Sequence, residues 1–175
     1  MQIHPTTLCE VKDNRSWFYF AYGSNINRDQ MALRCPTAEY RGHWFLRGWN
    51  LVFERHANIV PQRGGRVPGV IWRVRESDIE ALDAYEGLGY YYRRREWRQD
   101  GNSFFFYEML ESSRGGSPSI NYLEGIAQGY RQCGLDQKYL LQRISLPNYS
   151  DIGIHTSEMP KASATQPKLT RSLAS

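Results

Sequence analysis

Two short stretches of the sequence hold groups that could do chemistry, and the first follows an aromatic run. Trp17–Phe20 is succeeded by Gly23, Ser24 and Asn25, directly before a predicted helix. A strand that ends in small residues ahead of a helix leaves several backbone N–H groups without partners, and such a turn can bind an anion. An ordinary tight turn, capped locally by Ser24 and Asn25, explains the same residues. The local sequence leaves both interpretations open.

The second stretch places a carboxylate on the apolar face of a helix. Ile79, Leu82 and Glu86 stand at positions i, i+3 and i+7, so a helix brings them to one side. An acid on the core side of a helix is costly unless it is paired or needed. Enclosure in a pocket would raise the pKa of Glu86 toward neutrality, as a general base requires. A half-exposed glutamate near a frayed helix end is the competing interpretation.

Other catalytic and metal-binding patterns are absent from the sequence. Cys9, Cys35 and Cys133 lie far apart without CxxC spacing, which argues against both a zinc site and a disulfide framework. His43 and His56 match no signature of nucleophilic catalysis, and no G-x-S-x-G elbow is present. We therefore expect no metal, no cofactor, and a reducing, cytoplasmic setting.

Composition favours a globular protein that binds neither nucleic acid nor membrane. The chain has 175 residues, 41% of them hydrophobic and 14% aromatic, and a net charge of +4. Mean hydropathy is −0.63, no apolar run approaches the ~20 residues of a membrane helix, and the first residues lack the apolar core of a secretory signal. The run Arg93–Arg95 beside Tyr90–Tyr92 is compatible with nucleic-acid binding, but three arginines do not make a basic face.

These groups must be positioned by a single domain, expected over residues 16–146. Residues 1–15 are predicted to be a loose arm and residues 147–175, rich in Ser, Thr, Pro and Lys, a flexible tail. Short aromatic and β-branched runs predict strands at Ser16–Tyr22, Phe45–Phe53, Val67–Val74, Tyr92–Arg98 and Phe104–Leu110. The polar segment 54–66 is expected to be a loop, and Asp100-Gly101 a hairpin turn.

Capping residues and apolar periodicity predict the helices. Asn27 is expected to cap a helix that ends by Cys35, because Pro36 follows. Ser77 and Glu80 form a possible capping box for a second helix that stops at Gly87. Two later amphipathic helices are expected around residues 123–130 and 140–144. The predicted fold class is therefore α+β, with a small mixed β-barrel and flanking helices.

An ordered set of motifs resembles the γ-glutamylcyclotransferase-like family, including its γ-glutamylamine cyclotransferases. The motifs are "YFAYGSNINRDQM", "ANIVP" with "VPGVIW", "ALDAYEG" before "YYYRR", and "PSINYLEGIAQGYRQCGL". The resemblance implies a small β-barrel with a cavity at its mouth. It also implies that the glutamate of "YEG", Glu86, is the catalytic base. The implied substrate-binding residues are Tyr22, Gly23, Ser24, Asn25, Tyr92 and Tyr107, with Tyr91 as the alternative to Tyr92.

The resemblance implies an activity: cyclisation of a small-molecule γ-glutamyl amino acid or amine to 5-oxoproline, with release of the amine. A γ-glutamyl amide hydrolase on the same scaffold and a non-catalytic module that binds a small anion or a partner remain alternatives. The chain is expected to be a monomer or a homodimer. Arg55, Arg63 and Arg66 depart from the small residues common in this part of the family. If they border the pocket, they would favour a leaving group that carries a carboxylate.

Overall fold

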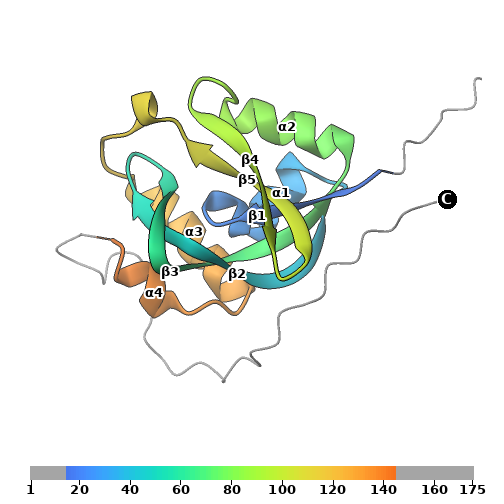
Figure 1. The fold of residues 1–175 in the computed structure, drawn as a ribbon. Coiled ribbons are helices and arrows are strands. Elements are labelled where there is room, and N and C mark those ends of the chain that lie inside the picture. The colour runs from blue at the N-terminus through green and yellow to red at the C-terminus, as the bar shows by residue number, and fades with distance from the viewer. Residues whose placement is uncertain (1–14, 145–175) are drawn as a thin grey trace, which may run out of the picture.

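The computed structural model describes residues 15–144, which Figure 1 shows in colour. The predicted C-terminal tail and, apart from Arg15, the predicted N-terminal arm lie outside the described residues. Within residues 15–144, no helix combines the length and the apolar character needed to cross a bilayer.

Five strands form one mixed sheet in the order β2-β3-β1-β5-β4. The strands are β1 (Trp17–Ala21), β2 (Glu39–Phe53), β3 (Ala57–Val74), β4 (Tyr92–Gln99) and β5 (Asn102–Met109). β1 pairs antiparallel with β3 and parallel with β5, while β2–β3 and β4–β5 are antiparallel pairs. The central strand β1 is buried over all but its first residue, as its aromatic run predicts. With the helices described below, the sheet confirms the α+β class.

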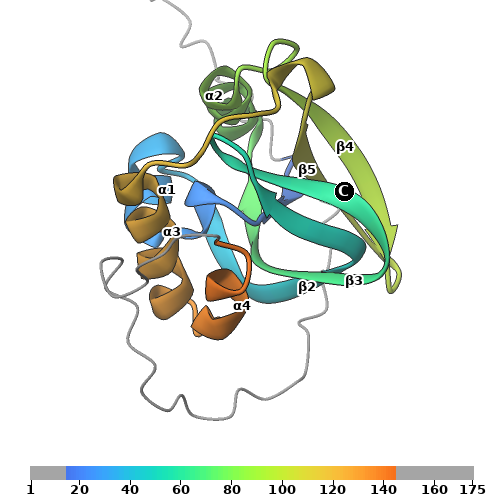
Figure 2. The same cartoon turned by 90° about the vertical axis from the view of Figure 1, so that its left-hand side faces the viewer.

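The sheet curls into an open barrel (Figure 2). The side chain of Gln99 bridges its two edges. Gln99 of β4 donates from Nε2 to the carbonyl oxygen of Phe45, 2.8 Å away, and its Oε1 accepts from the Arg47 N–H at 2.9 Å. Arg47 also pairs with Asp100 in the adjoining turn. β2 and β4 form no ladder with each other in the described sheet, so the predicted barrel is present but not closed by backbone pairing.

We expect Gln99→Leu to lower the free energy of unfolding by about 1–3 kcal/mol, because it leaves two backbone groups of β2 without partners. Arg47→Ala is the matched control. It removes an exposed ion pair worth about 0.2–1 kcal/mol and keeps both backbone bonds of the bridge. Urea unfolding of both variants measures the difference. Equal destabilisation would mean that the Gln99 bridge contributes no more than a surface ion pair.

The helices lie around the barrel in two groups. They are α1 (Arg28–Arg34), α2 (Glu76–Glu86), α3 (Ile120–Gln132) and α4 (Gln137–Leu141), with the 3₁₀ turns η1 (Ser24–Ile26) and η2 (Glu111–Ser113). In Figure 2, α2 lies at one end of the barrel, and α1, α3 and α4 line one side of it. The turn η1 therefore follows directly from β1 and leads into α1, which is the junction that the sequence singles out.

Several local signals are confirmed. Asn27 caps α1, accepting from the backbone N–H of Asp29 and Gln30 at 3.0 and 3.1 Å. Gly87 ends α2 in the left-handed conformation, with φ of 62°. Asp100 and Gly101 both have positive φ, as a two-residue type I′ hairpin requires.

Two expectations are wrong. Residues 54–66 are not a loop, because β3 begins at Ala57 and pairs with β2 as an extended hairpin, in which Gln62, Arg63 and Arg66 are exposed. Gly65 allows this pairing: a Cβ there would lie 2.3 Å from the carbonyl oxygen of Trp49. The start of α2 is also shifted. Its cap is Arg75, whose N–H donates to Asp78 Oδ2 at 3.0 Å, in place of the expected Ser77–Glu80 box.

The arginine run of β4 pairs within the domain. Arg93 and Arg95 both contact the buried carboxylate of Glu108 on β5, at 3.0 and 3.1 Å. Arg94 points to the other face and pairs with Asp83 of α2 at 3.3 Å. The run therefore joins β4 to its neighbours.

Candidate active site

Two adjoining hollows meet at Glu86. The inner one, about 20 Å³, is enclosed by the end of β1, the η1 turn and side chains from β3, α2, β4, β5 and α3. The outer cleft measures about 740 Å³ and opens toward the residues around η2. Four residues line both hollows: Ser24, Glu86, Tyr92 and Tyr122. The inner cavity has room for about one water-sized group.

The Glu86 carboxylate accepts a hydrogen bond from Asn25, in the turn between β1 and α1. Asn25 Nδ2 donates to Glu86 Oε1 at 2.9 Å and to the Tyr19 hydroxyl at 2.9 Å. Ile79 and Leu82, on the same face of α2, are buried in the core. The helical spacing thus turns Glu86 toward the interior, at the place where the core gives way to a cavity.

Burial raises the pKa of Glu86 to about 7, although the Arg34 guanidinium and the hydrogen bond from Asn25 both lower it. A carboxyl with this pKa is divided between its two protonation states near neutral pH. It can therefore accept a proton and return it, which is the requirement for a general acid–base catalyst.

The turn of Gly23, Ser24 and Asn25 lines the same cavity. Its first internal hydrogen bonds are those of the Ile26 and Asn27 N–H groups. Within residues 15–144, the N–H groups of Gly23, Ser24 and Asn25 have no acceptor. Such neighbouring donors suit a carboxylate or a developing oxyanion.

Position 23 leaves little room for a side chain, and its glycine does not adopt a positive φ. Its φ is −114°, and a Cβ there would lie 3.1 Å from the Ala57 Cβ and 3.3 Å from the Tyr122 hydroxyl. A larger residue here would therefore crowd Ala57 and Tyr122.

The three predicted tyrosines lie in the inner cavity, and each donates its proton to a neighbouring group. Tyr22 donates to the Tyr107 carbonyl, Tyr92 to the Ala57 carbonyl at 2.9 Å, and Tyr107 to Asp83 Oδ1 at 2.6 Å. Burial raises the pKa of all three phenols, so they stay neutral near pH 7. Their oxygens can therefore act as acceptors toward the cavity. Tyr91, the alternative to Tyr92, is exposed and lines only the outer cleft.

The sequence interpretation missed several groups that complete the site. Tyr19 and Tyr122 line the inner cavity, and each hydroxyl accepts a hydrogen bond, from Asn25 Nδ2 and from the Ala57 N–H respectively. Arg34 donates a hydrogen bond to the side-chain oxygen of Asn25, and Asp83 accepts one from the Tyr107 hydroxyl. The "PSINY" motif contains Tyr122 and was the available signal for that residue. Nothing local marks Arg34 or Asp83.

The three arginines considered for the pocket mouth lie in different places in the structure. Arg55 lines the outer cleft, together with His56 and Arg114. Arg63 and Arg66 line neither hollow, and the Arg66 guanidinium lies 3.6 Å from the ring centre of Phe45. They belong to the exposed part of the β2–β3 hairpin, so of the three arginines only Arg55 meets the condition of bordering the pocket.

The remaining candidates for chemistry lie elsewhere or are inert. Burial raises the pKa of the Cys35 thiol to about 12, which leaves it protonated. His43 packs on Phe45, and His56, whose pKa burial lowers, packs on Tyr122 in the outer cleft. Residues 15–144 contain no cluster of three or more His, Cys, Asp or Glu that could hold a metal.

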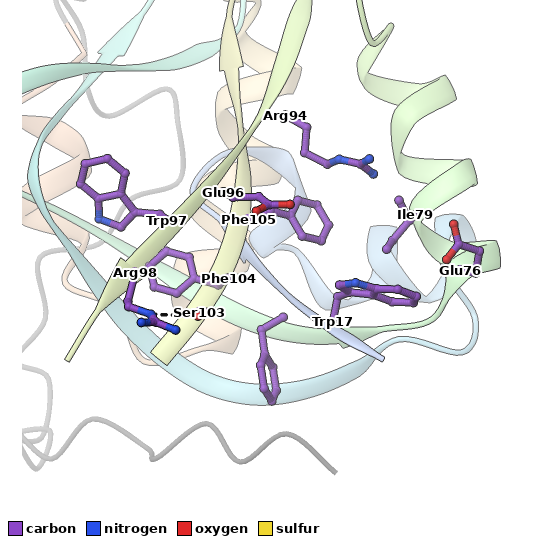
Figure 3. Close-up of a pocket in the computed structure, with 11 residues that line it drawn as sticks. Trp17, Glu76, Ile79, Arg94, Glu96, Trp97, Arg98, Ser103, Phe104 and Phe105 are labelled. Carbon is purple, nitrogen blue, oxygen red and sulfur yellow. Dashed lines mark hydrogen bonds between the residues drawn. The ribbon is translucent and has the colours of Figure 1, made fainter. Parts of the chain in front are cut away.

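A separate groove of about 640 Å³ lies between α2 and the β4–β5 hairpin (Figure 3). Its walls include Trp17, Ile79 and Phe105, with charged residues of both signs at its edges. None of its lining residues lines the Glu86 hollows. It therefore contributes nothing to the chemistry of that site.

Comparison with known proteins agrees with the motifs. The profile of the family described as "Gamma-glutamyl cyclotransferase, AIG2-like" matches residues 19–124. The mouse γ-glutamylcyclotransferase is 30% identical over 148 residues, which cover 73% of this chain and 77% of the mouse protein. The human γ-glutamylcyclotransferase is 28% identical over 144 residues, which cover 73% of this chain and 77% of the human protein. A solved γ-glutamyl cyclotransferase structure superposes with a TM-score of 0.64 at 27% identity, covering 83% of this chain and 94% of that one. The chain therefore belongs to the γ-glutamyl cyclotransferase, AIG2-like family.

Proposed function

We infer that this protein is a γ-glutamylcyclotransferase that converts a γ-glutamyl amide to 5-oxoproline and a free amine or amino acid. The observation that carries this proposal is the meeting of Glu86, with a pKa of about 7, and the unpaired N–H groups of Gly23–Asn25 in one cavity. The family assignment supports the same reaction. A reducing, cytoplasmic setting belongs to this proposal, and the reaction needs no cofactor.

In the proposed reaction the substrate supplies both reacting groups. Glu86 takes a proton from the α-ammonium, and the freed amine attacks the γ-carbonyl carbon, forming the C–N bond of a five-membered lactam. In the tetrahedral intermediate Glu86 gives this proton to the leaving nitrogen and takes the second proton of the attacking nitrogen. The intermediate then collapses to the lactam, the bond to the leaving nitrogen breaks, and Glu86 passes the second proton to the released amine. Well-oriented intramolecular attack has effective molarities of about 10⁵–10⁸ M, so the protein contributes mainly orientation and proton transfer.

The inner cavity suits the ammonium end of the substrate. It holds about one water-sized group, and an ammonium is of that size. The carboxylate of Glu86 and the acceptor oxygens of Tyr22, Tyr92 and Tyr107 favour a cation there. The rest of the substrate then lies in the outer cleft. Ser24 lines both hollows, so its N–H is the donor of this turn that we assign to the glutamyl carboxylate or the oxyanion in the outer cleft.

The outer cleft favours a leaving group that carries a carboxylate. Arg55 and Arg114 line it, and within residues 15–144 neither guanidinium has an ion-pair partner. We expect γ-glutamyl-alanine to be a better substrate than γ-glutamyl-ethylamine by about tenfold in kcat/KM, or about 1.4 kcal/mol. Arg55→Ala should remove most of this preference. Arg63→Ala, in β3 of the same hairpin but outside both hollows, should keep it. A preference that survives the Arg55 and Arg114 changes would exclude arginine selection.

The proposed function is tested by incubating the full chain with γ-glutamyl amino acids, γ-glutamyl amines and glutathione, and identifying the products. We expect 5-oxoproline and the free amine in equal amounts. Free glutamate in place of 5-oxoproline would show that water has replaced the internal amine, as in the hydrolase alternative. No turnover across the panel, with binding retained, would favour the non-catalytic alternative.

A further inference from the structure

Arg34, the last residue of α1, contacts the Glu86 site without lining it. Its Nη1 donates to Asn25 Oδ1 at 2.6 Å and to Ser24 Oγ at 3.1 Å, and its Nη2 donates to Gln30 Oε1 at 2.7 Å. The guanidinium also stacks on the ring of Tyr85, with Cζ 3.7 Å from the ring centre. The Arg34 guanidinium thus has four side-chain partners, which are Ser24, Asn25, Gln30 and Tyr85.

These contacts decide which way the Asn25 amide faces. A guanidinium has only donors, so it requires the amide oxygen of Asn25 to point toward Arg34. The amide nitrogen must then point the other way, toward Glu86 Oε1 and the Tyr19 hydroxyl. A flipped amide would set its oxygen against the Glu86 carboxylate and its NH₂ group against the guanidinium, which are two repulsive contacts.

We propose that Arg34 is a positioning residue: it fixes the Asn25 amide so that an N–H donor faces Glu86, and its charge favours the ionised carboxylate. The catalytic consequence rests on the proposed function, whereas the effect on the carboxylate itself does not. Loss of Arg34 removes a nearby positive charge and also frees the amide to turn. Both changes disfavour the ionised form, so the pKa of Glu86 should rise further.

The other groups that face Glu86 do not obscure this effect. Five buried phenols face the site, and burial raises the pKa of each, so all stay neutral. They are Tyr19 on β1, Tyr22 just after β1, Tyr92 on β4, Tyr107 on β5 and Tyr122 on α3. Tyr85 of α2 stacks on Arg34 itself. His56, in the turn between β2 and β3, lines the outer cleft, and burial and the Arg55 charge lower its pKa.

The test is a direct titration of Glu86 in the full chain, which needs no turnover. Carboxyl-¹³C glutamate is incorporated, and the Glu86 resonance is the one that Glu86→Gln removes. We expect the midpoint in Arg34→Met to lie about one pH unit or more above wild type. Arg34→Lys, which keeps the charge but not the planar fork, should lie between the two. Arg28→Met is the control, because it removes an arginine of the same helix that stacks on Tyr40, away from the site.

Enzyme kinetics then separate positioning from support of the fold. A rise in the Glu86 pKa should lower kcat/KM about tenfold at pH 6 and much less at pH 9, because only the ionised carboxylate acts as the base. An unshifted midpoint in folded Arg34→Met, or a loss of activity equal at all pH values, would overturn the proposal. If Arg34→Met does not fold, Arg34→Lys and Arg34→Gln carry the same comparison. A shifted midpoint in a protein without turnover would support Arg34 positioning and count against the proposed function alone.

Discussion

Glu86→Gln should abolish turnover while leaving the fold intact. The substitution preserves the shape of the side chain but removes the group that exchanges a proton with the substrate. General acid–base catalysis contributes about 10²–10⁴-fold, so kcat/KM should fall by at least about 10²-fold at every pH. Steady-state assay for 5-oxoproline measures the loss. Glu80→Gln, on an exposed position of the same helix, is the matched control and should retain full activity.

The same variant should also change the pH dependence of stability. Burial raises the folded-state pKa of Glu86 from 4.5 to about 7, so the protonated carboxyl stabilises the fold below pH 4.5. This contribution is lost as pH rises through 7, where the ionised group is buried at a cost. Glutamine does not ionise, so Glu86→Gln should melt above wild type at about pH 8 and near it at about pH 4. Turnover within threefold of wild type, or a lower melting temperature at both pH values, would contradict this account.

Asn25→Asp should give the second largest loss, by placing a carboxylate against Glu86. The amide nitrogen of Asn25 lies 2.9 Å from Glu86 Oε1, so an aspartate there sets two carboxyl groups in contact. Like charges at this distance share a proton, and Arg34, 2.6 Å from the Asn25 oxygen, keeps the new carboxylate ionised. Glu86 would then hold its proton to higher pH. We expect kcat/KM to fall about 10²-fold at pH 7 and to recover much of this loss at pH 9.

The pH profile of kcat/KM distinguishes this mechanism from misfolding. Its acid limb should move to higher pH in Asn25→Asp, whereas an unfolded fraction would lower all points alike. Asn50→Asp is the matched control, because Asn50 also accepts a hydrogen bond from an arginine, Arg143 at 3.1 Å, but takes no part in the site. It should keep both the profile and the rate. An unmoved acid limb in Asn25→Asp would argue against the Asn25–Glu86 contact in solution.

Features that depend on neighbouring residues could be predicted from the sequence. The Asn27 cap, the Gly87 stop and the Asp100-Gly101 turn all arise from groups within a few positions of each other. The direction of Glu86 is of the same kind, because its position follows from the helical period counted from Ile79. The ordered motifs placed the chain in its family, which the comparisons confirm.

The segment 54–66 shows where local composition fails. Its arginines and glycines are typical of a loop, and the sequence was interpreted so. In the structure most of these residues belong to β3, because β2 supplies the backbone partners and the polar side chains face solvent. Hydrogen bonding to a partner strand does not depend on the polarity of the exposed side chains. Because the segment is an extended hairpin and not a compact loop, Arg55 lines the outer cleft while Arg63 and Arg66 do not.

The chemistry of the site was decided by contacts between distant parts of the chain. Asn25 and Glu86 are 61 positions apart, and Ala57 and Tyr122 are 65 apart, yet each pair is joined by a hydrogen bond. The sequence determined that Glu86 shares a helix face with Ile79 and Leu82 and that Gly23, Ser24 and Asn25 follow the first strand, and it left the role of each open. Only the tertiary structure decided that the two meet and that Arg34 orients the amide between them. The pKa of Glu86 belongs to this second class, because burial by surrounding elements, which no local pattern encodes, is its main cause.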